Sequence, residues 1–219
     1  MANEVTILIP TYFAGTMLYN CLDSIYKNIP NAQVITFKND IGWLQAANHL
    51  LALVDTDVIL MNDDTIVLTD IVKEMRNLAY SDDTIAIVGA KMLSPNQETV
   101  INYGIYIGKD GNTAHKHFGD NKNKVNKIEI QKAVEGSCMY IKREALKSIG
   151  YFDEGYGKGY REEVDLCLRA KEAGWKIVSC PTAEVIHFTN QTHGKLGITN
   201  DSYDYFMSKW ATKLKLGVV

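Results

Sequence analysis

Short apolar strands alternate with helical segments over the first ninety residues, and this alternation constrains the fold more than any other feature. Four runs rich in β-branched residues favour buried strands: Val5–Ile9, Val34–Phe37, Asp57–Met61 and Ile85–Val88. Three segments between them carry apolar residues at helical spacing: Thr16–Asn28, Gly42–Val54 and Ile71–Tyr80. Such an alternation forms a parallel sheet with helices on both faces. We therefore predict an α/β fold with a Rossmann-like, mostly parallel central sheet.

The second half of the chain is less regular. We expect a strand at Ile101–Ile107 with a hairpin-like turn at 109–112, followed by a mobile, Lys- and Asn-rich loop over 112–130. The remaining expected strands are Ala133–Ile141 and two short ones around Pro181, Lys176–Ser179 and Ala183–His187. The remaining expected helices are Lys142–Ser148, Glu162–Ala173 and Ser202–Leu216.

Composition excludes several classes of protein. With 22% charged residues and a net charge of −3, the chain lacks the basic balance of a nucleic-acid-binding protein. Its four cysteines show no C-x-x-C spacing, which disfavours a zinc ribbon, and no secretory pattern is evident. No apolar run approaches the roughly 20 residues that span a bilayer. We expect a cytoplasmic protein with reduced thiols, no nucleic-acid partner and at most peripheral membrane contact.

Two polar clusters follow predicted strands at their carboxyl ends, where open α/β sheets bind ligands. Pro10, Thr11 and Tyr12 follow the first strand, and Asn62-Asp63-Asp64 follows the third. Carboxylates at such an edge can hold a divalent cation that neutralises a diphosphate. Taken alone, an Asp-Asp pair is more often a turn or a helix cap.

Three carboxylates open the predicted helix at Glu162–Ala173: Glu162, Glu163 and Asp165. The helix dipole stabilises negative charge at a helix N-terminus, and this structural effect alone explains why the three carboxylates lie there. Alternatively, one or two face a cleft, where crowded charges raise a carboxyl pKa toward that of a general base. His187 ends an apolar strand, and a single histidine there is more often structural than a metal ligand.

Together these segments resemble glycosyltransferase family 2, the inverting transferases of GT-A fold, in its rhamnosyltransferase-like and polysaccharide-assembly branch. Five stretches carry the resemblance in the family's order: Ile7–Tyr12, Asn39–Asn48, Val58–Thr65, Val134–Arg143, and the long signature that runs from Gly150 to His187. The third resembles the strand that ends in the Asp-x-Asp metal motif. The last resembles the "G-x-F-D-E … E-D-x-D-L" signature with its later Pro and His.

The resemblance implies roles for individual residues. Asp64 and His187 would bind Mn²⁺ or Mg²⁺, and Glu163 would be the catalytic base, with Glu162 or Asp165 as substitutes. The residues implied to contact the nucleotide-sugar donor are Pro10, Thr11, Tyr12, Asn39, Gly42, Asn48, Asn62, Asp63 and Gly136.

This chain departs from the family's pattern in two places. Glu163 stands where the family usually has Asp, and Asn62 replaces the first acid of the metal motif. The interval from Pro10 to Asn48 is also too short for one strand–helix unit of the family, which usually helps to hold the base of the nucleotide. We therefore expect a GT-A fold whose first half is shortened by about one βα unit.

The function implied is metal-dependent transfer of a sugar, with inversion, from a UDP-, GDP- or dTDP-sugar to a glycan or lipid-linked acceptor. We expect one domain over 1–219: a donor-binding half at 1–90, an acceptor and catalytic half at 91–200, and a C-terminal helix at 201–219. Two alternatives remain open. One is a degenerate, non-catalytic domain that binds nucleotide or glycan. The other is a sugar nucleotidyltransferase, which the absence of Lys and Arg from residues 11–15 disfavours.

Overall fold

A computed structural model describes residues 4–12, 15–157, 159–189 and 201–219. Within these residues, nine strands form one sheet in the order β2-β1-β3-β10-β5-β11-β4, with β6 paired to β5 and β9 paired to β11. The strands of this sheet are β1 Val5–Thr11, β2 Gln33–Lys38, β3 Asp57–Met61, β4 Thr65–Val67, β5 Ile85–Leu93, β6 Val100–Asn102, β9 Glu129–Gln131, β10 Cys138–Ile141 and β11 Lys176–His187. A separate small sheet pairs β7 Ile105–Ile107 with β8 Thr113–His115.

The sheet is mixed, with a parallel framework. Strand β1 is parallel to β2 and β3, and β5 is parallel to β11. Strand β10 is antiparallel to both β3 and β5 and joins the two parallel groups. The predicted α/β fold is therefore confirmed, with the second half of the chain supplying the antiparallel strands.

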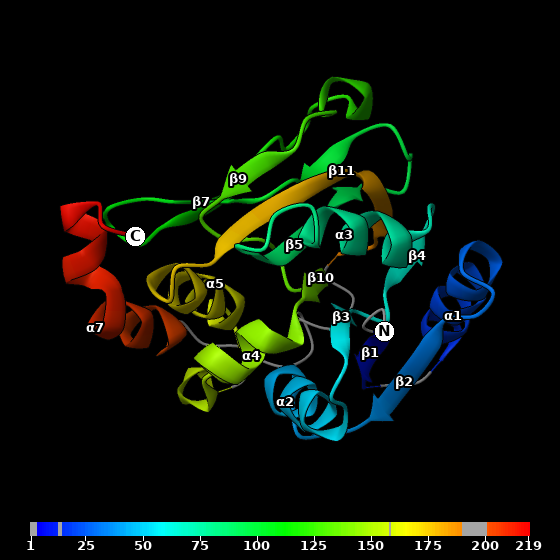
Figure 1. Cartoon of the computed structure of the whole chain (residues 1–219), viewed down its shortest axis with the longest axis horizontal. Coiled ribbons are helices and arrows are strands. Elements are labelled where there is room, and N and C mark those ends of the chain that lie inside the picture. Colours follow the sequence, from blue (N-terminus) through cyan, green and yellow to red (C-terminus); the bar gives the residue numbers. More distant parts are fainter. Residues whose placement is uncertain (1–3, 13–14, 158, 190–200) are drawn as a thin grey trace.

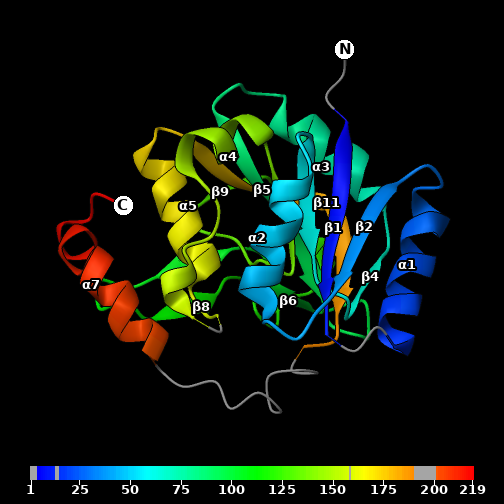
Figure 2. The ribbon, with the colours of Figure 1, turned by 90° about the horizontal axis from the view of Figure 1, so that it is seen from below.

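Helices cover both faces of the sheet (Figure 1). On one face lie α2 Trp43–Leu53, α4 Arg143–Ile149, α5 Glu162–Glu172 and α7 Asp201–Leu216, and on the other lie α1 Thr16–Asn28 and α3 Ile71–Ala79. Alternation along β1 explains the two layers, because Leu8 packs with the first group and Ile7 and Ile9 with the second. Figure 2 shows α2, α4 and α5 side by side along the first face. Among the described residues, no helix combines the length and apolarity needed to cross a bilayer.

Between β1 and α2 the described residues form only one helix, α1, and one strand, β2, as the sequence predicts. Strand β2 pairs with β1 from Thr6 to Thr11 and leads through residues 39–42 directly into α2. Gly42 precedes that helix with φ +104°, a conformation that favours glycine. The segment that begins with Asn39 therefore lies beside the carboxyl end of β1.

Several predicted boundaries in the second half are wrong. The expected strand at Ile101–Ile107 is broken at Gly104, whose φ is +115°, so that β6 and β7 join different sheets. Only Cys138–Ile141 of the expected strand at Ala133–Ile141 is a strand. The two strands expected around Pro181 are one strand, β11, with an irregular register between Cys180 and Glu184.

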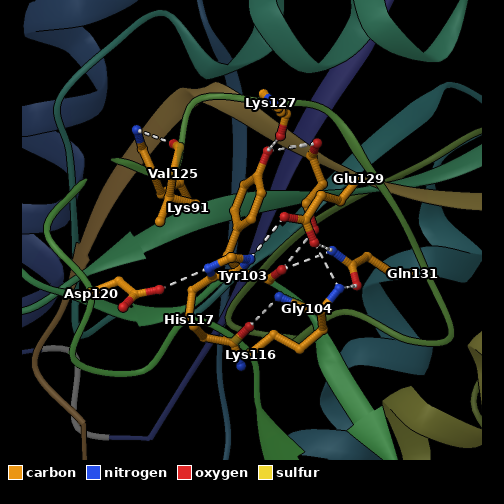
Figure 3. A network of polar contacts seen from close by, with 12 residues as sticks. Lys91, Tyr103, Gly104, Lys116, His117, Asp120, Val125, Lys127, Glu129 and Gln131 are labelled. Atoms are coloured by element: carbon orange, nitrogen blue, oxygen red, sulfur yellow. Dashed lines mark hydrogen bonds and ion pairs between the residues drawn. The ribbon is translucent and has the colours of Figure 1, made fainter. Parts of the chain in front are cut away.

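The expected loop at 112–130 is also wrong, because it contains β8, a 3₁₀ turn at Lys122–Lys124 and the start of β9. A polar network orders it (Figure 3). Glu129 binds Lys116 Nζ at 2.7 Å and His117 Nε2 at 2.8 Å. The buried Tyr103 hydroxyl donates to the carbonyls of Lys127 and Ser179 at 2.7 and 2.9 Å. These bonds tie the segment to β11, so we assign the network a structural role.

Candidate active site

The turn after β3 lies beside the end of β11, because β4, which follows that turn, pairs with β11. His187 is the last residue of β11 and pairs with Thr65 of β4, directly after Asp64. This register brings His187 Nε2 to 3.2 Å from Asp64 Oδ1. The two residues are only 7% and 9% exposed. The structure thus joins two residues that lie more than 120 positions apart in the sequence.

A second carboxylate lies on the other side of the imidazole. Glu135 Oε1 is 3.4 Å from His187 Nδ1. Burial opposes the charge on His187, but Asp64 and Glu135 outweigh it and raise the pKa of His187 to about 9. The sequence analysis did not single out Glu135, although an acid beside the small residues Gly136 and Ser137 was a usable signal.

Buried polar atoms without hydrogen bonds mark this group as a candidate metal and ligand site. Asp64 Oδ1, His187 Nδ1 and Glu135 Oε2 make no hydrogen bond among the described residues, although Asp64 Oδ1 and His187 Nδ1 each lie within ion-pair distance of another member of the group. Buried polar atoms normally have partners, so such a group indicates an additional ligand. The part of the chain that the structure describes has no set of three His, Cys, Asp or Glu side chains suited to a metal. A cation completed by substrate phosphates takes only one or two protein carboxylates, so Asp64 fits such a metal, and His187 would add an imidazole nitrogen once the cation displaces its proton.

The predicted donor residues of β1 and β2 gather beside this group. Thr11 Oγ1 donates to Asp63 Oδ2, and burial raises the pKa of Asp63 although the Thr11 bond opposes that shift. The Asn39 backbone N–H and its side-chain amide donate to the Thr11 carbonyl at 3.0 and 3.3 Å. Pro10 is buried within β1, whereas Tyr12 is 38% exposed at its end.

An open hollow adjoins Asp63 and Asp64 on the side of α1. Its lining residues come from the start of α1, the turn after β3, strand β4 and the residue after β11: Met17, Asn20, Asp63, Asp64, Thr65, Ile66 and Phe188. Met17 and Asn20 were not predicted as site residues. Their helical pattern alone gave no sign that the first turn of α1 borders the carboxylates.

Gly136 brings Glu163 to the same region. A Cβ at Gly136 would lie 3.2 Å from the Trp43 ring, which is a tight contact, and 3.6 Å from Glu163 Cβ, which is an ordinary one. Burial raises the pKa of Glu163 to about 7; its backbone hydrogen bonds and Arg161 oppose the shift, while the charge of Glu135 adds to it.

Glu162 precedes the candidate base and is 8% exposed. Its Oε2 has no hydrogen-bond partner among the described residues. Burial, followed by the charge of Glu163, raises the pKa of Glu162 well above its usual value. The N-terminus of α5 therefore presents two adjacent carboxyls whose pKa values are both raised, that of Glu163 to about 7.

Asp165 does not join this group. It is fully buried between α5 and α7. Its carboxylate accepts hydrogen bonds or ion pairs from four side chains: Tyr156, Arg169, Lys209 and Trp210. With these partners, Asp165 holds the packing of α7 on α5 and has no free oxygen to offer a substrate.

Two of the residues predicted to bind the donor, Asn48 and Gly42, have structural roles. Asn48 exchanges two hydrogen bonds with the backbone of Phe152, at 2.9 and 3.0 Å, and so ties α2 to the loop before α5. Gly42 supplies the positive φ that starts α2. Asn62, by contrast, lies beside the metal candidates, and its carbonyl oxygen Oδ1 accepts from Trp43 Nε1 at 2.8 Å.

Comparison with known proteins identifies the family. The family described as "Glycosyltransferase like family 2" matches residues 30–201. The chain is 29% identical over 186 residues to the uncharacterized protein y4gI of Sinorhizobium fredii, covering 80% of this chain and 20% of that protein. It is 42% identical over 62 residues to the N-acetylglucosaminyl-diphospho-decaprenol L-rhamnosyltransferase of Mycobacterium tuberculosis, covering 28% of this chain and 20% of that protein. The chain thus spans about a fifth of the length of these curated relatives.

Solved structures share the fold. GalNAc-T7, crystallised with UDP, GalNAc and Mn²⁺, superposes with a TM-score of 0.73 at 14% identity, covering 97% of this chain and 50% of that one. The mannosyltransferase PcManGT from Pyrobaculum calidifontis, in complex with GDP-Man and Mn²⁺, gives a TM-score of 0.58 at 13% identity, covering 88% and 59%. The chain therefore has the GT-A fold and belongs to the glycosyltransferase-like family 2.

Proposed function

We propose that this chain transfers a sugar from a nucleotide-diphosphate-sugar to a hydroxyl of a glycan or lipid-linked saccharide, with inversion at the anomeric carbon. The observation that carries the proposal is the buried Asp64–His187 ion pair, whose Oδ1 and Nδ1 atoms make no hydrogen bond among the described residues, in one site with a carboxyl of near-neutral pKa at Glu163. The ligands named for the solved structures, UDP or GDP-Man with Mn²⁺, support it.

The donor side is formed mainly by residues 1–90. Thr11, Asn39 and Asp63 are linked by hydrogen bonds at the carboxyl end of β1 and would contact the nucleoside together with Pro10 and Tyr12. We assign residues 91–200 to the acceptor and to catalysis, since Glu135, Gly136, Glu163 and His187 belong to that half. A UDP-, GDP- or dTDP-sugar fits the proposal.

Asp64 and His187 would hold Mn²⁺ or Mg²⁺. Such a cation supplies charge that neutralises the leaving diphosphate. Glu135 would fix the orientation of the His187 ring, since the second nitrogen of a metal-binding histidine usually has a carboxylate or carbonyl partner.

Glu163 would accept the proton of the acceptor hydroxyl. A base with a pKa near 7 combines a large ionised fraction at neutral pH with adequate basicity. The acceptor oxygen forms a bond to the anomeric carbon while the bond from that carbon to the diphosphate oxygen breaks. Attack from the face opposite the leaving group inverts the configuration, and the proton passes from Glu163 to water. Glu162, whose pKa burial raises, would lie beside the substrate as a hydrogen-bonding partner for a sugar oxygen.

The test is a panel of UDP-, GDP- and dTDP-sugars with Mn²⁺, first by thermal shift and then by NMR of the products. Binding should raise the melting temperature by mass action, and the matching acceptor should yield an inverted glycoside. Asp64→Asn should lose the Mn²⁺-dependent part of the shift, whereas the exposed control Asp83→Asn should keep it. Binding without transfer to any acceptor would support a non-catalytic domain, and no binding at all would reject the proposal.

A further inference from the structure

Arg161 has an unusual backbone conformation directly before the two carboxyls at the start of α5. Its φ is +73° and that of Tyr160 is +72°, so both residues lie in the left-handed region. Among the described residues they are the only adjacent pair of non-glycine residues with positive φ. A side chain disfavours this conformation roughly five- to thirtyfold, so other contacts must hold it.

The side chain of Arg161 makes such contacts. Its Nη1 donates to the Gly111 carbonyl at 2.8 Å, and its guanidinium carbon lies 5.0 and 5.5 Å from the centres of the Tyr203 and Phe206 rings. An aromatic face attracts a cation at this distance. The Tyr203 hydroxyl also donates to the Asp110 carbonyl at 2.7 Å. Helix α7 and the turn between β7 and β8 therefore hold the guanidinium together.

These contacts fix the direction of the candidate base, Glu163. The Arg161 carbonyl accepts from the Asp165 backbone N–H at 2.8 Å, a bond that starts α5. Asp165 is itself bound to α7, which lies beside α5 in Figures 1 and 2. Both ends of the first turn of α5 are thus held against α7. Because helical residues follow one another at about 100°, Glu163, two residues from each end, lies on the opposite side, near Gly136.

We propose that Arg161 is a positioning residue for sugar transfer: held by α7 and the turn between β7 and β8, it keeps its backbone left-handed and so directs Glu163 toward the acceptor hydroxyl. The inference rests on the proposed function, in which Glu163 is the base. It adds the residue that places the base, and it gives α7 a role in the reaction without contact to the substrate.

Two substitutions separate this role from the simple loss of a side chain. Arg161→Ala and Arg161→Gly both remove the guanidinium. Alanine disfavours positive φ, whereas glycine adopts positive φ about as readily as negative φ. Residue 161 should therefore be left-handed in roughly one molecule in five to thirty with alanine, and in about half of the molecules with glycine.

The experiment measures the initial rate of transfer at saturating nucleotide-sugar, acceptor and Mn²⁺. The rates are compared on the alkaline plateau of each pH–rate profile, because both variants lose a charge that lowers the Glu163 pKa. We expect a loss of about five- to thirtyfold in Arg161→Ala and about twofold in Arg161→Gly, with unchanged nucleotide binding by calorimetry. Arg76→Ala is the matched control, since Arg76 also lies over a ring, that of Tyr80 at 5.1 Å, and it should transfer sugar at the wild-type rate.

A wild-type rate in Arg161→Ala, or equal losses in the alanine and glycine variants, would overturn the inference. Tyr203→Leu tests the same contacts without a change in α5. Loss of one ring should lower the rate about two- to fivefold, whereas Tyr203→Phe keeps the ring and should stay near the wild-type rate. Equal rates in the two Tyr203 variants would also overturn the inference.

Crystal structures of Arg161→Ala and Arg161→Gly give a readout that does not depend on activity. Residue 161 should leave the left-handed region with alanine, and the Glu163 carboxyl should move with it, whereas the glycine variant should keep both. A Glu163 carboxyl that stays in place in Arg161→Ala would contradict the inference. A wild type that transfers no sugar would reject the proposed function alone, because these structures still decide the positioning.

Discussion

Asp165 provides the sharpest distinction between a structural and a catalytic carboxylate in this chain. It lies two residues after the candidate base, yet it is fully buried and accepts from four side chains. Two of these, Arg169 and Lys209, are cations, at 2.7 and 2.5 Å. Lys209 also has Asp153 at 2.7 Å, whereas the only carboxylate paired with Arg169 among the described residues is Asp165.

Asp165→Asn removes the negative charge and leaves two cations facing a neutral amide. Breaking a buried ion pair by removing one partner typically costs about 3–5 kcal/mol. Proteins of this size lose roughly 2–4 °C of melting temperature per kcal/mol, so we expect the midpoint to fall by about 6–20 °C. Because total stability is commonly about 5–15 kcal/mol, the variant should fold but be markedly weakened.

Urea denaturation followed by circular dichroism measures the free energy of unfolding. Glu172→Gln is the matched control, since Glu172 also joins α5 to α7 through Lys213 but at the surface, where a pair contributes about 0–1 kcal/mol. Transfer activity of folded Asp165→Asn, measured well below its melting temperature, should stay within a few-fold of the wild type. Unchanged stability with abolished turnover would refute the assignment and place Asp165 in the chemistry.

Three further predictions concern the site. The transfer rate should rise as pH increases through about 7, because burial raises the Glu163 pKa and only the deprotonated form is a base; a pH–rate profile that is flat from pH 5 to 8 would contradict this. Gly136→Ala should lower transfer about tenfold with little loss of nucleotide binding, because the added Cβ crowds the Trp43 ring beside Glu163; steady-state kinetics and calorimetry separate the two effects. His187→Ala should lose most of the stabilisation by Mn²⁺, which amounts to about 2.7 kcal/mol at 100 times the dissociation constant; an unchanged Mn²⁺ thermal shift would remove His187 from the metal site.

The regular part of the fold was predictable because its signals are local. Strands β1, β3 and β5 are buried throughout and mostly apolar, and α1 and α2 carry apolar residues at helical spacing. The segment 100–135 was not predictable in the same way. Its strands have three residues each, and tertiary partners such as Tyr103 and Glu129 fix them. Short strands of this kind carry too few residues for periodicity to be read.

The motifs of the candidate site could be predicted from the sequence. Which residues within those motifs face the site could not. The sequence pattern indicated that Asp64 follows one strand and that His187 ends another, and the register of β4 and β11 joins them. Which carboxylate of α5 faces the site depends on where α7 packs, and that information lies some forty residues away at Lys209 and Trp210. Glu135 was missed because its partner, His187, is distant in sequence.

The most direct test of the central claim is the initial rate of sugar transfer by Glu163→Gln at saturating nucleotide-sugar and Mn²⁺. Loss of a general base typically lowers the rate by about 10²–10⁴, and glutamine keeps the shape of the side chain. We predict a loss of that size with unchanged nucleotide binding and melting temperature, and partial activity in Glu163→Asp. A Glu163→Gln variant that transfers sugar at the wild-type rate would contradict the account.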